Sequence, residues 1–195
     1  MQLILGSSSP RRKEVLQFFS LSFTQAISSF PEEEVPFLGD PISYVTTLAQ
    51  GKGRLLQQTH SDAAILTGDT VVFCEDKIYN KPKDLAEATE FLTILSGKWS
   101  SVFTALALTT KEKELVLVEE TKLLFRTLSL EQITHYLHAV PFLDKAGGFA
   151  IQRGGALVIE KIDGCYYNVM GMPLGALSTL LHTIGIDLWE RIHLL

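Results

Sequence analysis

Residues 3–19 read LILGSSSPRRKEVLQFF, a stretch that predicts a strand, a tight turn and a helix in immediate succession. The apolar run at residues 2–6 has the composition of a buried strand. Ser9 is placed to cap the helix and Pro10 to be its first residue, because a proline there has no N–H to leave unsatisfied. A strand that leads through a short turn into a helix is the basic unit of an α/β protein.

The rest of the chain continues this alternation. Residues 63–73, AAILTGDTVVF, form an apolar, β-branched run that is typical of a central parallel strand. Residues 101–109 and 115–125 read as two strands joined by a charged turn, which predicts a hairpin. The fold class predicted is therefore α/β, with a mixed, twisted sheet flanked by helices. The remaining expected elements are strands at 23–27 and 157–162 and helices at 42–56, 84–96, 129–139 and 174–184, of which the helices opened by Asp84 with Glu87 and by Ser129 with Gln132 begin with capping boxes.

Length and composition limit the class of protein. The chain has 195 residues, of which 46% are hydrophobic and 20% charged, as in a globular domain. We expect a single domain over residues 1–195, and two lobes with a cleft between them are the alternative. No apolar run approaches the roughly 20 residues that span a bilayer, and no leader is recognisable, so no membrane partner and a cytoplasmic location are expected. Cys74 and Cys165 are expected to be reduced core thiols.

The net charge of −5 argues against a surface for a nucleic-acid polymer, so any anion site must be a local cluster. Such a cluster follows the first strand, where three serines precede Arg11, Arg12 and Lys13. Cations at a helix N-terminus oppose the helix dipole, at a cost of a few tenths of a kcal/mol each. A bound phosphate or polyphosphate explains their position better than a solvated basic turn, which is the alternative.

Asp69 interrupts the apolar run at 63–73. Burying an unpaired carboxylate costs several kcal/mol, so this residue needs a metal, a cation or a cleft. Gly68 before it allows another group to approach the backbone closely. We expect a metal ligand or a base at the carboxyl end of the strand; an aspartate that caps a turn is the alternative.

Lys52 breaks a second apolar pattern. It takes the next inward position of the helical stripe formed by residues 45, 49 and 56, and it is flanked by Gly51 and Gly53. Each glycine costs a helix about 1 kcal/mol relative to alanine. A lysine directed into a polar cleft accounts for these glycines, whereas a snorkelling lysine is the alternative.

Six segments resemble the Maf family, and they occur in that family's order: LILGSSSPRRKEVL, LAQGK, GDTVVFCEDKIYNKP, LSG, DKAGGFAIQ and GCYYNVMGMPL. The resemblance implies a fold similar to that of the inosine triphosphate pyrophosphatases and a homodimer. It also implies hydrolysis of dTTP and UTP, and of modified pyrimidine nucleotides, to the monophosphate and pyrophosphate. The implied cofactor is Mg²⁺ or Mn²⁺, and the implied partner is a nucleoside triphosphate.

The resemblance also assigns the site residues. It places catalysis on Asp69, Glu33, Lys52 and Lys81, with Glu33 and Asp69 holding the metal; the middle position among three consecutive glutamates is uncertain by one place. It places substrate binding on Ser7, Arg11, Arg12, Thr70 and Gln152. Lys145 in DKAGG is expected either to approach the phosphates or to pair with Asp144.

The sequence departs from the family pattern in three places. Gly68 stands for an alanine, Ala105 stands for a glycine, and Ser100 lies where the family has a histidine. Because that histidine is missing, a non-catalytic nucleotide-binding regulator of cell division and septum formation is the alternative function. A pyrophosphatase directed at purine nucleotides is a further one.

Overall fold

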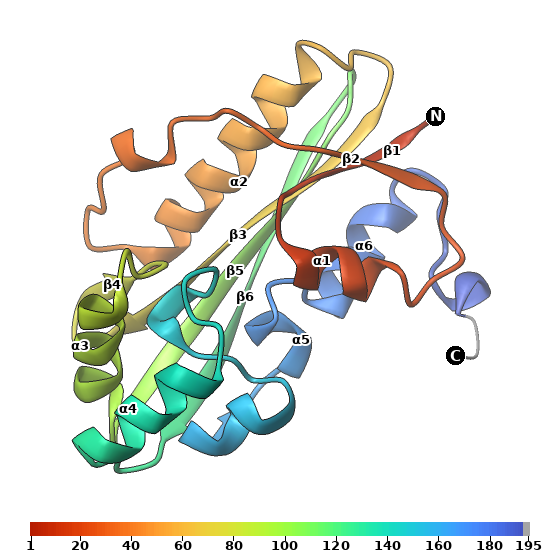
Figure 1. The fold of residues 1–195 in the computed structure, drawn as a ribbon. Helices are drawn as coiled ribbons and strands as arrows, with labels where there is room; N and C mark the ends of the chain where they lie inside the picture. The colour runs from red at the N-terminus through yellow and green to blue at the C-terminus, as the bar shows by residue number, and fades with distance from the viewer. Residues whose placement is uncertain (193–195) are drawn as a thin grey trace.

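The computed structural model describes residues 1–192 of the chain. The strands in that part of the chain form one seven-stranded sheet, shown edge-on in Figure 1. Strand β1 is parallel to β2 and β3, whereas β3, β5, β6 and β7 are successively antiparallel. The predicted mixed sheet is therefore confirmed. In spatial order the strands are β2 (Phe23–Ala26), β1 (Leu3–Gly6), β3 (Ala64–Cys74), β5 (Trp99–Thr109), β6 (Glu114–Phe125) and β7 (Ile159–Asp163), with β4 (Lys77–Tyr79) paired to β3.

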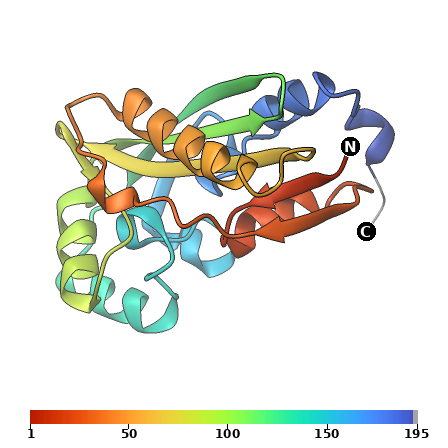
Figure 2. The ribbon, with the colours of Figure 1, turned by 90° about the horizontal axis from the view of Figure 1, so that it is seen from above.

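Helices cover both faces of the sheet. Helix α2 (Pro41–Gln57) packs across β3 and β5 on one face, and Figure 1 shows α1, α5 and α6 on the opposite side of these long strands. Helices α3 and α4 also pack into the core cluster of that second side. Figure 2 shows α3 and α4 packed together at one end of the sheet. The helices of that second side are α1 (Pro10–Leu16), α3 (Leu85–Leu95), α4 (Leu130–Ala139), α5 (Tyr166–Val169) and α6 (Leu174–His182).

The core is divided by the alternation of side chains along β3. Val71 packs with Tyr44 and Leu48 of α2, whereas its neighbour Val72 belongs to the larger apolar cluster on the other face. Successive residues of a strand point to opposite faces. Asp69 therefore faces the α2 side, and Thr70 faces the side of α1 and α5.

One edge of β3 is open over a short stretch. Pairing with β1 ends at Gly6, opposite Thr67, and pairing with β4 begins at Val72. Between these points, the described strands leave residues 68–71 without a partner on that edge. The open stretch gives Asp69 and Thr70 access to a common space, although they point to opposite faces.

Two sequence predictions for β3 were wrong in part. The strand is central but parallel only to β1, because β5 runs back along it in antiparallel register. Asp69 does not lie at the carboxyl end, since the strand continues to Cys74. Asp69 instead lies just past the carboxyl end of the neighbouring strand β1, where the pairing between β1 and β3 stops.

Other predictions differ in detail from the structure. The capping box of α4 is present, but in α3 only Asp84 caps, because the Glu87 side chain accepts from Lys83 N. Both cysteines are free thiols; Cys74 is buried, whereas Cys165 is half-buried and so lies outside the core.

Candidate functional site

A cavity opens at the unpaired stretch of β3. Segments far apart in the chain line it: the β1–α1 turn, α2, β3, the loop after β4 and the glycine-rich loop after α4. It brings together eight of the nine residues assigned to the site from the sequence. It also includes three charged residues that were not assigned to it. The eight are Ser7, Arg11, Arg12, Lys52, Asp69, Thr70, Lys81 and Gln152; the three are Glu32, Asp144 and Lys145.

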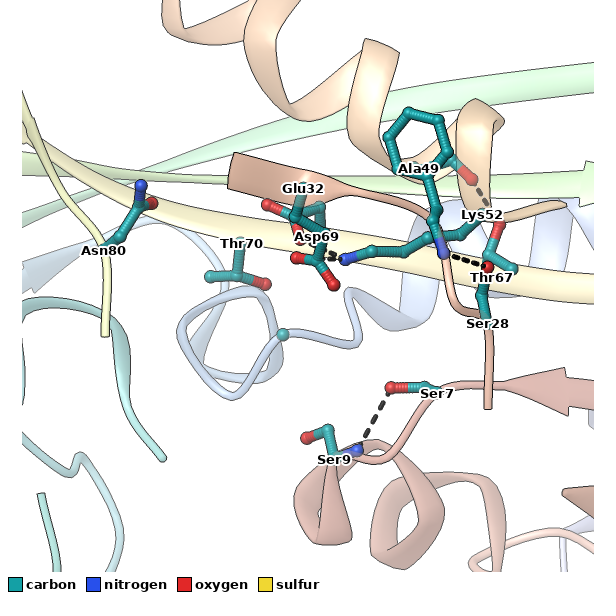
Figure 3. Close-up of polar contacts among 12 residues, drawn as sticks. Ser7, Ser9, Ser28, Glu32, Ala49, Lys52, Thr67, Asp69, Thr70 and Asn80 are labelled. Atoms are coloured by element: carbon teal, nitrogen blue, oxygen red, sulfur yellow. Dashed lines mark hydrogen bonds and ion pairs between the residues drawn. The ribbon is translucent and has the colours of Figure 1, made fainter. Parts of the chain in front are cut away.

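Lys52 joins two carboxylates inside this cavity. Its Nζ lies 2.6 Å from Asp69 Oδ1 and 2.8 Å from Glu32 Oε2, as Figure 3 shows. The lysine and aspartate side chains are only 10% and 12% exposed, whereas that of Glu32 is 47% exposed. The pair is thus held in a region of low dielectric, with Glu32 at the open side.

The glycines beside Lys52 allow α2 to pack closely. A Cβ at Gly51 would lie 2.4 Å from the Phe30 ring, and a Cβ at Gly53 would lie 2.5 Å from Thr109 Oγ1. Both distances are shorter than real Cβ contacts. The close packing holds the helix against the sheet, so the lysine reaches Asp69 rather than solvent.

Glu33 is the one assigned residue that does not line the cavity. It belongs, with its neighbours, to the 3₁₀ turn Glu32–Glu34, in which successive side chains point about 120° apart. Only one of the three can then face Lys52, and the structure places Glu32 there. The glutamate beside Lys52 is thus Glu32, one place before the residue assigned from the sequence, where the identical neighbours could not be told apart.

Arg12 is a buried link between three segments. Its Nε donates to Gly171 O at 2.8 Å, its Nη1 to Ser7 Oγ at 3.2 Å and its Nη2 to Thr70 Oγ1 at 2.9 Å. Burial lowers the pKa of its guanidinium, and the nearby Asp69 carboxylate partly offsets this. Gly171 has a φ of +87°, and a Cβ there would lie 2.9 Å from Thr70 Oγ1, so this turn requires glycine.

Arg11 points to a different partner. Its Nη1 lies 2.6 Å from Asp144 Oδ2, and its Nη2 donates to the main-chain oxygen of the same residue at 2.8 Å. Lys145 Nζ lies 2.5 Å from the other carboxylate oxygen. Burial raises the pKa of Asp144, but the hydrogen bonds from Lys145 and Arg11 outweigh it and the pKa is lowered. Lys145 therefore pairs with Asp144, which is one of the two alternatives, and it also lines the cavity.

Tyr136 anchors the loop that carries Gln152. Its hydroxyl accepts from Ala150 N at 3.0 Å and donates to Gly155 O at 3.0 Å. Gln152 lines both the cavity and a wider neighbouring groove. A tyrosine of α4 thereby fixes the wall between the two.

Two charged residues of the cavity, Glu32 and Asp144, were not assigned to the site from the sequence. Glu32 differs from its neighbours only by its place in a three-residue turn. Asp144 lies 133 residues from its partner Arg11, so no local pattern joins them. The ion pair with Arg11 and the place of Asp144 in the cavity wall are known only from the structure.

A family model for Maf-like proteins matches residues 2–184. The chain belongs to the Maf family. Among its relatives, a "dTTP/UTP pyrophosphatase" of Chlamydia felis is 46% identical over 190 residues, which is 97% of each chain. A "nucleoside triphosphate pyrophosphatase" of Chlamydia pneumoniae is 38% identical over 192 residues, also 97% of each. A crystal structure of a nucleoside-triphosphatase, dITP/XTP pyrophosphatase, from Mycobacterium abscessus aligns with a TM-score of 0.48 and 17% identity, covering 94% of this chain and 95% of that one.

The carboxylates of this Maf family chain suit a hard divalent cation. Residues 1–192 contain no group of three or more His, Cys, Asp or Glu placed to hold a metal. Mg²⁺, however, is usually bound by one or two carboxylates together with substrate phosphates. Asp69 and Glu32 already share one cation, the Lys52 ammonium, so their oxygens converge closely enough to serve that ion.

The position at which the family has a histidine, occupied here by Ser100, lies outside the cavity. Ser100, which takes its place, is buried and lines a separate surface hollow near Trp99 and Lys122. The substitution therefore removes no group from the cavity wall. Among residues 1–192, no helix is both long enough and apolar enough to cross a bilayer.

Proposed function

We propose that this protein hydrolyses dTTP and UTP between the α and β phosphates, giving the nucleoside monophosphate and pyrophosphate. The observation that carries the proposal is the cavity that Arg11, Lys81 and Lys145 line together with two carboxylates held by Lys52. A triphosphate needs several cations, and a hydrolase needs an acid or base beside them. The names of the relatives support the pyrimidine substrates.

Asp69 is the proposed general base. Lys52 holds its Oδ1, whereas its Oδ2 has no hydrogen-bond partner in the described part of the chain. In this arrangement Oδ2 accepts a proton from a water molecule that attacks the α-phosphorus in line with the leaving pyrophosphate. Lys52 holds the carboxylate in the orientation for that transfer.

Arg11, Lys81 and Lys145 are proposed to bind the phosphates. Each lines the cavity, and Arg11 and Lys145 are held in place by Asp144. Cations that are already oriented stabilise the charge that develops on the leaving oxygen without reorganising during the reaction. Glu32, in place of Glu33, and Asp69 would hold Mg²⁺ or Mn²⁺, which supplies Lewis-acid activation of the phosphates and of water when bound.

Three further expectations remain proposals. We infer a homodimer, a cytoplasmic location and activity on modified pyrimidine nucleotides from the family resemblance. The alternative of a non-catalytic regulator of septum formation is not favoured, since the curated relatives are named as pyrophosphatases.

The test is pyrophosphate release from dTTP, UTP, CTP, ITP and GTP with Mg²⁺, with kcat/KM measured for each. We expect the two named pyrimidine nucleotides to be at least tenfold better substrates than the others, as a pocket that pairs with specific base groups requires. Asp69→Asn should abolish turnover, and Asp163→Asn, at an exposed position of β7, should not. Equal rates on all nucleotides, or full activity of Asp69→Asn, would refute the assignment.

A further inference from the structure

We infer that Thr104 and Asn168, two buried residues that do not line the cavity, fix the direction of the hydrogen bonds at its wall. As a result, Thr70 can only accept from a ligand. Ser7, whose lone pairs are taken by Ser9 N and Arg12 Nη1, can only donate to one. The inference rests on the proposed function for the identity of the ligand. The hydrogen bonds themselves follow from the protein alone.

The direction is set where Thr104 meets Asn168. Thr104 is fully buried, and its Oγ1 lies 2.9 Å from Asn168 O and 3.0 Å from Thr70 Oγ1. A main-chain oxygen only accepts, so the single hydrogen of Thr104 is directed to Asn168 O. Thr70 must then donate its own hydrogen to Thr104, since this is the one assignment that makes both contacts hydrogen bonds.

Asn168 O is held firmly in this position. The Asn168 side chain donates from Nδ2 to Val102 O at 3.0 Å and to Thr121 Oγ1 at 2.9 Å, which fixes α5 against β5 and β6. The main-chain oxygen of Asn168 also accepts from Gly171 N at 2.8 Å. The chain of hydrogen bonds thus ends on a rigid acceptor with both lone pairs in use.

Thr70 consequently has no hydrogen for a ligand. Its Oγ1 accepts from Arg12 Nη2 at 2.9 Å and donates to Thr104, so one lone pair is left on the side of the cavity. Ionised phosphate oxygens only accept, so they cannot bond to this hydroxyl. Thr70 therefore selects a ligand N–H or O–H, such as those of a nucleobase or a sugar.

Ser7 is arranged in the opposite sense. Its Oγ accepts from Ser9 N at 3.2 Å and from Arg12 Nη1 at 3.2 Å, which uses both lone pairs. Its hydrogen remains available to a ligand acceptor. Ser7 therefore faces a phosphate oxygen, and the nucleoside lies toward Thr70. Arg12 donates to both hydroxyls; Thr104 orients that of Thr70, and Ser9 N completes the donors to Ser7.

The test uses Thr104→Val, which keeps the shape of the side chain and removes the hydroxyl. Thr109→Val is the matched control, because Thr109 is a buried threonine of the same strand whose Oγ1 has no partner in residues 1–192. Thr104→Ser should restore the wild-type result. Affinities for α,β-imido-dUTP and for inorganic pyrophosphate, both with Mg²⁺, are measured by calorimetry.

Thr104→Val should weaken binding of the imido-nucleotide about tenfold, as expected for one lost hydrogen bond, and leave pyrophosphate within about twofold. Thr109→Val should change neither affinity. Equal weakening of both ligands, no weakening, or the same effect in Thr109→Val would overturn the inference.

An independent readout concerns the protein without ligand. The Arg12 Nε–H signal in ¹⁵N-labelled protein should exchange slowly with water in the wild type and in Thr109→Val, and faster in Thr104→Val. Equal exchange in all three would overturn the network. If the wild type shows slow exchange but binds no nucleotide, the proposed function fails while the hydrogen-bond network stands.

Discussion

Lys52 Nζ lies 2.6 Å from Asp69 Oδ1, and this contact joins the middle of α2 to the middle of β3. Neither residue follows the apolar pattern of its own element. Each supplies the charge that the other requires, because a single buried ion of either sign would cost several kcal/mol. Asp69 also lies within the stretch of β3 that β1 and β4 leave open.

Replacing Lys52 by methionine tests this relationship. Asp69 and Glu32 would then repel one another unless a cation joins them, so we expect tighter binding of Mn²⁺ to the protein without substrate, by about tenfold. Turnover should fall at least a hundredfold, because Asp69 loses the group that orients it. Electron paramagnetic resonance measures the Mn²⁺ affinity separately from activity. Unchanged Mn²⁺ affinity would show that the two carboxylates do not act together.

Arg12→Lys and Arg11→Lys should differ strongly. A lysine at position 12 cannot serve Gly171 O, Ser7 and Thr70 together, so we expect a loss of about 3 kcal/mol of stability and at least a hundredfold in kcat/KM. At position 11 the contacts to Asp144 lie near the surface, and stability should change by less than about 1 kcal/mol. Urea unfolding and steady-state kinetics separate the two. Equal destabilisation by both variants would contradict the assignment of Arg12 as the buried link.

Asp144→Asn should change how the free energy of unfolding depends on pH in the acidic range. The pKa of Asp144 is lowered in the folded protein, so the folded state binds fewer protons than the unfolded one near pH 4. Its contribution is present above the unfolded pKa, about 3.9, and is lost as the pH falls through the folded value. The difference in free energy of unfolding between wild type and variant should therefore grow from pH 3 to pH 6 and then level. A difference that is constant with pH would show that the carboxylate charge is not involved.

The parts of the site that the sequence revealed are those in which a charge breaks an apolar pattern. Asp69 and Lys52 could be assigned to a polar cleft for that reason, and the structure places them in contact. The direction of β5 relative to β3 could not be predicted. A strand buried on both faces has the same composition whether its neighbour is parallel or antiparallel.

Residues that depend on distant contacts were also beyond sequence reasoning. Asp144 pairs with an arginine from the other end of the chain, and Thr104 is an ordinary strand threonine until its neighbours are known. Only the geometry of the short 3₁₀ turn distinguishes Glu32, which faces Lys52, from Glu33. In each case the deciding interaction lies in the tertiary structure.

Tyr136→Phe should loosen the loop that carries Gln152. The variant keeps the ring but leaves Ala150 N and Gly155 O without the partner that joins them, at a cost of about 1–3 kcal/mol. Burial raises the pKa of Tyr136 to about 12, so the folded state favours the protonated hydroxyl. This contribution is fully present below pH 10 and is lost as the pH rises toward 12. Unfolding measured from pH 8 to pH 11 should show wild-type stability falling toward that of the phenylalanine variant. If the two curves stay parallel over this range, the tyrosine hydroxyl does not hold the loop.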